Sequence, residues 1–161
     1  MYQLLAIRPD LEIIPIRGNI DTRIRKLYEA DSNGQMLDGI VLAAAGIKRL
    51  GRDLEITQYL SVDEMIPAPT QGTLALEVRA DNLELIGKIN ELCDIDTEDA
   101  VYLERGFLKA IGASCHDPVG AYAYKIENTW TVKAIFGKPD GSQLKKVAVQ
   151  GTDFDELIKR A

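Results

Sequence analysis

Arginines beside a glycine turn are the first side chains in this sequence whose types and spacing suggest chemistry. Residues 17–23 read Arg-Gly-Asn-Ile-Asp-Thr-Arg, after an apolar run and before a helical pattern. Ligands of open α/β sheets bind where strands end, and a helix N-terminus attracts anions. Gly18 would let an anion approach the backbone, and Arg23 would supply a counter-charge. An anion site is therefore one interpretation, and a solvated basic helix with Arg17 in a salt bridge is the other.

A second pair of cations, Lys48 and Arg49, follows the small residues Ala44, Ala45 and Gly46. Small residues allow either the close approach of a ligand or tight packing against a neighbouring element. Cations near a helix C-terminus also complement the helix dipole, and in isolation this is the favoured interpretation.

Cys115 lies in an expected loop between Gly112 and Pro118, beside Ser114 and His116. A loop thiol is accessible, and a nearby cation can lower its pKa. An ordinary loop cysteine is the alternative. Cys93 ends an expected helix and is interpreted as a small packing residue.

Composition narrows the function classes. The 161 residues carry a net charge of −6, with 46% hydrophobic residues, so the chain should fold and is a poor candidate for nucleic-acid binding. One His cannot supply a multi-His metal site, and two cysteines without a Cys-x-x-Cys motif argue against a disulfide framework or a redox pair. Without a membrane-length apolar run or a signal peptide, a soluble cytoplasmic protein is expected.

The elements expected to position these residues form an α/β unit over residues 1 to about 65. The pattern predicts a strand over 11–16, a helix from Ile20 to Tyr28, a strand over 39–45 and a short helix over 46–50. Prolines and a glycine mark residues 66–72 as a linker, and residues 73–78 alternate like a strand.

The second half is expected to be α+β. Residues 85–92 form one helical face, and Asp96 or Thr97 would cap a second helix. Alternating stretches over 119–126, 129–136 and 143–150 predict a three-stranded antiparallel sheet, and a last helix begins near residue 153.

Four motifs, at residues 17–23, 38–51, 69–72 and 115–120, occur in an order that closely resembles the hydroxymethylbilane synthase family, also called porphobilinogen deaminase. The resemblance implies a transferase of tetrapyrrole and haem biosynthesis. Such enzymes join four porphobilinogen molecules into linear hydroxymethylbilane and release ammonia at each step.

The resemblance also implies roles for individual residues. Cys115 matches the cysteine that carries the dipyrromethane cofactor through a thioether, although Ala113 and Ser114 stand where the family usually has two glycines. Family arginines that bind the acetate and propionate groups of cofactor and substrate correspond to Arg17, Arg23 and Arg49. The cofactor or substrate cleft would also be lined by Gly18, Thr22, Ala44, Gly46 and Gln71, and Arg105 would support the cofactor loop.

The family has three domains, and the resemblance covers the second and third. Residues 1–65 are then expected to form half of a periplasmic-binding-protein-like domain, 66–80 a hinge whose strand belongs to the first domain, and 81–161 the cofactor-carrying domain with its end cut short. The catalytic aspartate would lie in the missing domain, so the chain alone is expected to be an inactive piece of a longer protein with Cys115 free of cofactor.

Two further expectations concern the pairing of residues 73–78 and an alternative function. The strand over 73–78, without its sheet, would be disordered, repacked or paired with another copy of the chain. The alternative to the enzyme is a non-enzymatic anion-binding module on the same α/β fold, which would need Arg17 and Arg23 but not Cys115.

Overall fold

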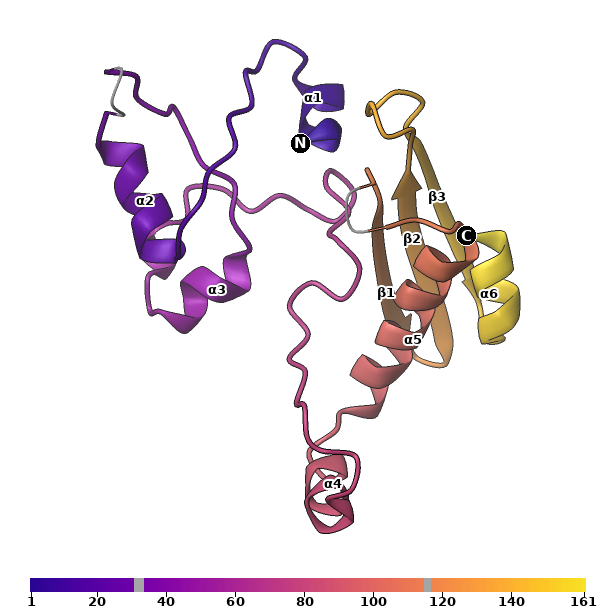
Figure 1. Cartoon of the computed structure of the whole chain (residues 1–161). Helices are drawn as coiled ribbons and strands as arrows, with labels where there is room; N and C mark the ends of the chain where they lie inside the picture. Colours follow the sequence, from indigo (N-terminus) through magenta and orange to yellow (C-terminus); the bar gives the residue numbers. More distant parts are fainter. Residues whose placement is uncertain (31–33, 115–116) are drawn as a thin grey trace. The chain divides into compact units, whose positions relative to one another are not determined.

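A computed structural model describes residues 1–30, 34–114 and 117–161 (Figure 1). The chain divides into two compact units. The first comprises residues 3–60 with Met1, and the second comprises residues 61–161 with Tyr2. A short helix, α1 (Tyr2–Ile7), opens the chain.

After α1, the described part of the first unit contains the helices α2 (Ile20–Tyr28) and α3 (Ala44–Arg49) and the 3-10 turn η1 (Asp53–Glu55). The helices α2 and α3 each bury one isoleucine, Ile24 and Ile47. They approach closely at Gly46, where an added Cβ would lie 2.6 Å from Ile20 Cδ1. The small residue that the sequence places here therefore serves helix packing.

The two strands expected in this unit are absent from the structure. Residues 11–16 and 39–43 are described without strand structure, and α3 already begins at Ala44. The prediction was wrong because an apolar run marks a segment for burial but does not supply a neighbouring strand to pair its backbone. The helix over 20–28 was predicted correctly.

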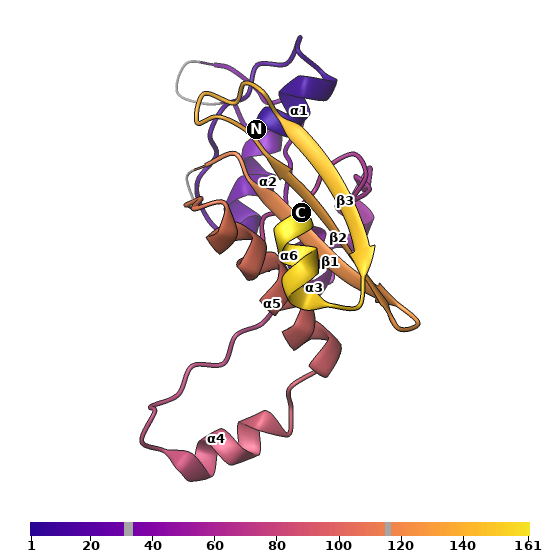
Figure 2. The ribbon, with the colours of Figure 1, turned by 90° about the vertical axis from the view of Figure 1, so that its right-hand side faces the viewer.

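The second unit is an antiparallel sheet with helices, as the sequence pattern indicates. Its elements are α4 (Leu83–Asn90), α5 (Ile95–Ala110), β1 (Gly120–Ile126), β2 (Thr129–Phe136), β3 (Lys145–Gly151) and α6 (Phe154–Arg160). The strand order is β1-β2-β3, with both pairs antiparallel. Helix α5 packs against β1 and α6 against β3 (Figures 1 and 2). The N-cap of α5 is Asp94, whose carboxylate accepts from Thr97 N, rather than Asp96 or Thr97.

The core of this unit lies between the sheet and helices α5 and α6. Leu103 and Phe107 on α5 and Leu157 on α6 are almost completely buried. Along β1 the buried positions are small residues, Gly120, Ala121 and Ala123, which leave room for the larger helix side chains. The central strand β2 is buried at consecutive positions, from Trp130 to Val132 and at Ala134 and Ile135, so the core of this unit forms around it.

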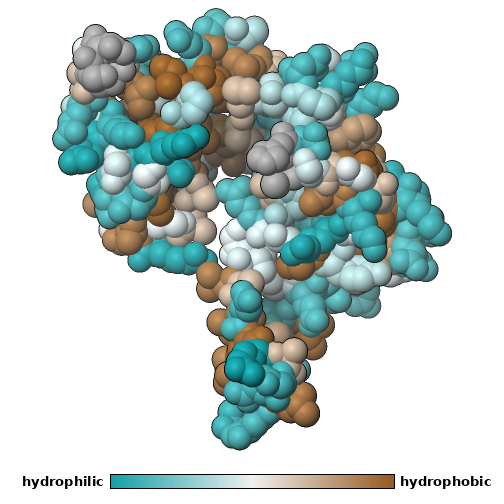
Figure 3. Space-filling model, viewed as in Figure 1, coloured by the Kyte–Doolittle hydropathy of each residue, from teal (hydrophilic) through white to brown (hydrophobic). Residues whose placement is uncertain are grey.

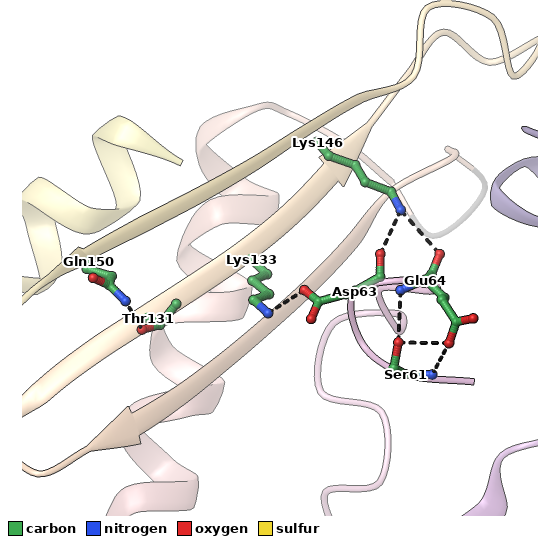
Figure 4. Close-up of polar contacts among 7 residues, drawn as sticks. All are labelled: Ser61, Asp63, Glu64, Thr131, Lys133, Lys146 and Gln150. Atoms are coloured by element: carbon green, nitrogen blue, oxygen red, sulfur yellow. Dashed lines mark hydrogen bonds and ion pairs between the residues drawn. The ribbon is translucent and has the colours of Figure 1, made fainter. Parts of the chain in front are cut away.

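A turn over residues 61–64 is tied to β2 and β3 by two lysines (Figure 4). Lys133 Nζ lies 2.5 Å from Asp63 Oδ1. Lys146 Nζ donates to the backbone carbonyls of Asp63 and Glu64 at 3.1 and 3.2 Å. Within the turn, the backbone N–H and hydroxyl of Ser61 donate to Glu64 Oε2, and these bonds hold the pKa of Glu64 below its usual value. The start of the second unit is thereby anchored to its sheet.

Residues 66–67 cover the start of the free edge of β1, at Gly120 and Ala121. Ala121 N donates to Pro67 O at 3.0 Å, and Ile66 is buried. A Cβ on Gly120 would lie 2.8 Å from the carbonyl oxygens of Ile66 and Pro67, so this close approach needs glycine. An edge strand covered in this way is protected from pairing with other chains.

Apolar side chains remain on the surface of the second unit. Leu74 and Leu76 are exposed in a run over 73–78 that forms no strand, contrary to the alternating pattern. Leu83 on α4 is 76% exposed, and apolar residues on this helix are visible in Figure 3. None of the helices in the described ranges combines the length and the apolar character that crossing a membrane requires.

Candidate functional site

The N-terminus of α2 is built from the arginine–glycine turn that the sequence singled out. Asn19 caps the helix, because its Oδ1 accepts from Thr22 N at 2.8 Å. Gly18 has φ +122°, and a Cβ there would lie 2.8 Å from Thr22 Cγ2. Both the backbone angle and the space therefore require glycine at this position.

Two cations of α2 turn back onto this loop. Arg23 Nε donates to Gly18 O at 2.8 Å, and Lys26 Nζ donates to Arg17 O at 3.1 Å. The carbonyl groups of the loop are thus occupied, while the two terminal NH₂ groups of Arg23 form no hydrogen bond with the described residues. The loop keeps its backbone fixed and presents positive charge at the helix start.

Arg17 and Arg49 remain available for an anion. Both are exposed, and neither guanidinium has a side-chain partner within the described parts of the chain. Lys48, next to Arg49, lies with its Nζ 5.0 Å from the centre of the Tyr59 ring. The salt bridge that was part of the alternative for Arg17 is not found among the described residues, and anion binding at this helix start stays a prediction.

The comparisons with known proteins decide the family. Residues 1–87 match a family model described as "porphobilinogen deaminase, dipyromethane cofactor binding domain". Residues 99–160 match the model described as "porphobilinogen deaminase, C-terminal domain". The chain belongs to the porphobilinogen deaminase family.

Curated relatives agree with the family models. A porphobilinogen deaminase of Lachnospira eligens is 49% identical over 156 residues, which are 96% of this chain and 52% of that protein. The one of Clostridioides difficile is 44% identical over 96% of this chain and 48% of its own length. The one of Oceanobacillus iheyensis is 44% identical over 99% of this chain and 50% of its own length. The chain spans about half the length of these relatives.

The porphobilinogen deaminase residues expected at a common site fall into three groups. Arg17, Gly18, Thr22 and Arg23 lie together at the start of α2, and Arg49 lies at the end of α3, all in the first unit. Gln71 belongs to the second unit. Cys115, the expected attachment point of dipyrromethane in this family, lies outside the described residues together with His116.

Gln71 closes a turn and lines a pocket of the second unit. Its Oε1 accepts from Ala68 N at 3.3 Å. The pocket, of about 400 Å³, is also lined by Glu104 of α5 and by Tyr122 and Tyr124 of β1. The role of Gln71 as a substrate-lining residue in the porphobilinogen deaminase site stays a prediction.

The expectation for Cys115 lies outside the described residues and stays a prediction. Among its described neighbours, Asp117 Oδ2 accepts from the backbone N–H and the hydroxyl of Ser114 at 2.7 and 2.9 Å. Cys93, interpreted as a packing residue, is exposed instead. That prediction was wrong because the end of α4 has no core around it, which residue type alone does not reveal.

Glu104 is a buried carboxylate that the sequence reasoning missed. Its Oε1 accepts from Ala123 N at 2.8 Å and its Oε2 from Thr70 N at 2.5 Å. Burial raises its pKa above the usual value, and these two hydrogen bonds only partly oppose the shift. The sequence contained a signal for the burial of Glu104. Residues 100, 103, 104 and 107 share one helix face, and Glu104 is the charged residue on that otherwise apolar face.

Arg52 and Asp21 were also missed as a pair. Arg52 Nη1 lies 2.5 Å from Asp21 Oδ1 on α2. No periodic pattern connects positions 31 residues apart, so only the tertiary structure could reveal this contact.

Proposed function

We propose that this chain carries part of the site of a transferase that joins four porphobilinogen units into hydroxymethylbilane and releases ammonia. The main support is the match of residues 1–87 to the dipyromethane cofactor binding domain, because this stretch contains Arg17, Arg23 and Arg49. The names of the relatives support the same reaction class.

In this proposal the arginines bind carboxylates. Each pyrrole unit of the substrate and cofactor brings an acetate and a propionate group, so the ligand needs several guanidinium groups. The guanidiniums of Arg17 and Arg49, which have no side-chain partner among the described residues, and the NH₂ groups of Arg23 could meet this need. The positive end of α2 adds to the attraction.

Cys115 would hold the dipyrromethane cofactor through its sulfur. When bound, this group supplies the pyrrole end to which substrate units are joined. The described residues beside Cys115 in sequence, Ser114 and Asp117, are hydrogen-bonded to each other. Arg105, exposed on α5, is proposed to support the cofactor loop.

Three finer points stay predictions. Residues 1–65 are proposed as half of a periplasmic-binding-protein-like domain, 66–80 as a hinge, and 81–161 as the cofactor-carrying domain. The chain by itself is proposed to form no hydroxymethylbilane, because the arginines are only one part of the site. The protein is proposed to be located in the cytoplasm.

Porphobilinogen should bind to this chain through the arginines. In a calorimetric titration, Arg17→Met and Arg49→Met are each expected to raise the Kd about tenfold, since each removes a charge-assisted contact to a carboxylate. Arg8→Met is the matched control, because Arg8 already pairs with Asp10 through two hydrogen bonds on the surface. Equal Kd values for all four proteins would contradict the proposed carboxylate site.

Residues 73–78 are proposed to pair with a second strand, either of the whole enzyme or of another copy. Their exposed Leu74 and Leu76 support this proposal. Light scattering after size exclusion should show a dimer that Leu76→Lys converts to monomer, because a charge disfavours edge pairing. A wild-type chain that stays monomeric at high concentration would exclude pairing between copies.

A further inference from the structure

Arg52 makes the densest set of ion pairs in the described part of the first unit. Its Nη1 lies 2.5 Å from Asp21 Oδ1, its Nη2 donates to Glu55 Oε2 at 2.8 Å, and its Nε donates to Glu55 Oε1. The Arg52 side chain is 30% exposed. One guanidinium thus bridges the first turn of α2 and the 3-10 turn η1 in the bidentate geometry that suits arginine.

The backbone of Arg52 belongs to the end of α3. Gly51, with φ +67°, donates its N–H to Lys48 O at 2.9 Å, and Arg52 N donates to Ile47 O at 3.2 Å. These two bonds form a Schellman motif, which fixes the chain direction after a helix. The main chain of Arg52 therefore moves with α3, while its side chain holds α2.

The apolar contact between the same two helices is small. Ile20 lies against Gly46, and each of the two helices buries a single isoleucine, Ile24 on α2 and Ile47 on α3. A contact of this size leaves the angle between two short helices weakly determined. The Arg52 bridge adds a directional link at the edge of this contact.

The charges distinguish Arg52 from the proposed binding arginines. Its guanidinium faces the carboxylates of Asp21 and Glu55, which raise its pKa. Arg49, three residues earlier on the same helix end, has no such partner in the described chain. Arg52 is therefore committed to the fold, whereas Arg49 is free to meet a ligand.

We propose that Arg52 is a positioning residue that holds Arg23 on α2 and Arg49 on α3 at the spacing needed to bind carboxylates of one pyrrole ligand. This inference rests on the proposed function. Two binding groups on a rigid frame gain effective concentration that is lost when they move independently. Loss of the Arg52 bridge should thus weaken binding even though Arg52 does not contact the ligand.

The direct test is a titration of the chain with porphobilinogen. Arg52→Met is expected to raise the Kd about five- to twentyfold, and Arg52→Lys should rescue little, because a lysine cannot bridge two carboxylates in fork geometry. Asp21→Asn removes only the ion pair of Arg52 with α2 and leaves the pair with Glu55, so it should give a smaller rise in Kd. Arg8→Met, which breaks a surface arginine–carboxylate fork within one loop, should leave the Kd unchanged.

A double-mutant cycle separates positioning from general stability. Adding Arg49→Met to Arg52→Met should cost less than Arg49→Met costs in wild type, because the cooperation between Arg23 and Arg49 is already lost. If the factors by which the two single substitutions raise the Kd simply multiply in the double variant, Arg52 does not act through Arg49, and the proposal is overturned.

The packing of the two helices gives a readout that does not depend on ligand. The nuclear Overhauser effect between the Ile20 δ-methyl and the Gly46 α-protons should weaken in Arg52→Met while the chain stays folded. If it persists unchanged, the positioning role is wrong. Wild-type chain that binds no porphobilinogen would overturn the proposed function and the ligand role of Arg52, whereas binding that is insensitive to Arg52→Met would overturn this inference alone.

Discussion

Replacing Cys115 by serine is expected to abolish the attachment of pyrrole units. A thioether requires a sulfur nucleophile, and a serine hydroxyl without an activating base does not replace a thiolate. The test is a chimera that joins this chain to the part of the Lachnospira eligens relative that it does not match. Intact mass measurement should show two added pyrrole units with Cys115 and none with serine.

Cys93→Ser is the matched control for this substitution. Cys93 is exposed, so it tests whether any accessible thiol reacts. The control should leave the added mass unchanged. A serine variant at 115 that still carries pyrrole units would contradict the assignment, and a wild-type chimera without added mass would favour the anion-binding module instead.

Glu104→Ala is expected to lower the free energy of unfolding of the second unit by about 2–4 kcal/mol. The substitution leaves the N–H groups of Ala123 and Thr70 without their acceptor, and an unsatisfied buried donor costs about 1–3 kcal/mol. Chemical denaturation followed by Trp130 fluorescence measures the change, because Trp130 is buried in the same unit. Glu91→Ala, at an exposed position, should change the stability little and serves as the control.

The stability contributed by Glu104 should also depend on pH in a defined direction. Its pKa is raised in the folded state, so between its usual value and the raised value the folded chain binds more protons than the unfolded chain. Stability then falls as pH rises through this window and is greatest below it. Glu104→Gln cannot titrate, and wild type should gain stability relative to this variant as pH falls. A difference that is constant with pH would contradict the buried charge.

Much of the second unit could be predicted because its signals are local. Alternation over residues 119–126 and 129–136 reports strands with one buried face, and antiparallel neighbours need only a short turn between them. The structure places β1 and β2 within a residue of those bounds. The same reasoning failed for residues 11–16 and 39–45, because an apolar run does not say which strand will pair with it.

The candidate site was predictable in its residue types and less so in its contacts. Arg17 and Arg23 beside Gly18 indicated one possible anion site at a helix start, and the structure confirms the turn and the helix there. The contacts of Glu104 and the Arg52–Asp21 pair were missed because the groups they join lie 19 to 34 residues apart along the chain. Such contacts depend on how elements pack, which is not a local property.

The sequence by itself determined the family of this protein, the arginine-rich helix start and the sheet with its helices. Motif residues and periodicity depend on neighbours within a few positions, so they can be recognised along the chain. Only the tertiary structure decided that Glu104 joins α5 to β1 and to the loop at Thr70, and that Arg52 holds α2 on α3. These links join groups far apart in sequence, and a buried carboxylate or a bridging guanidinium takes its role from the partners that folding brings to it.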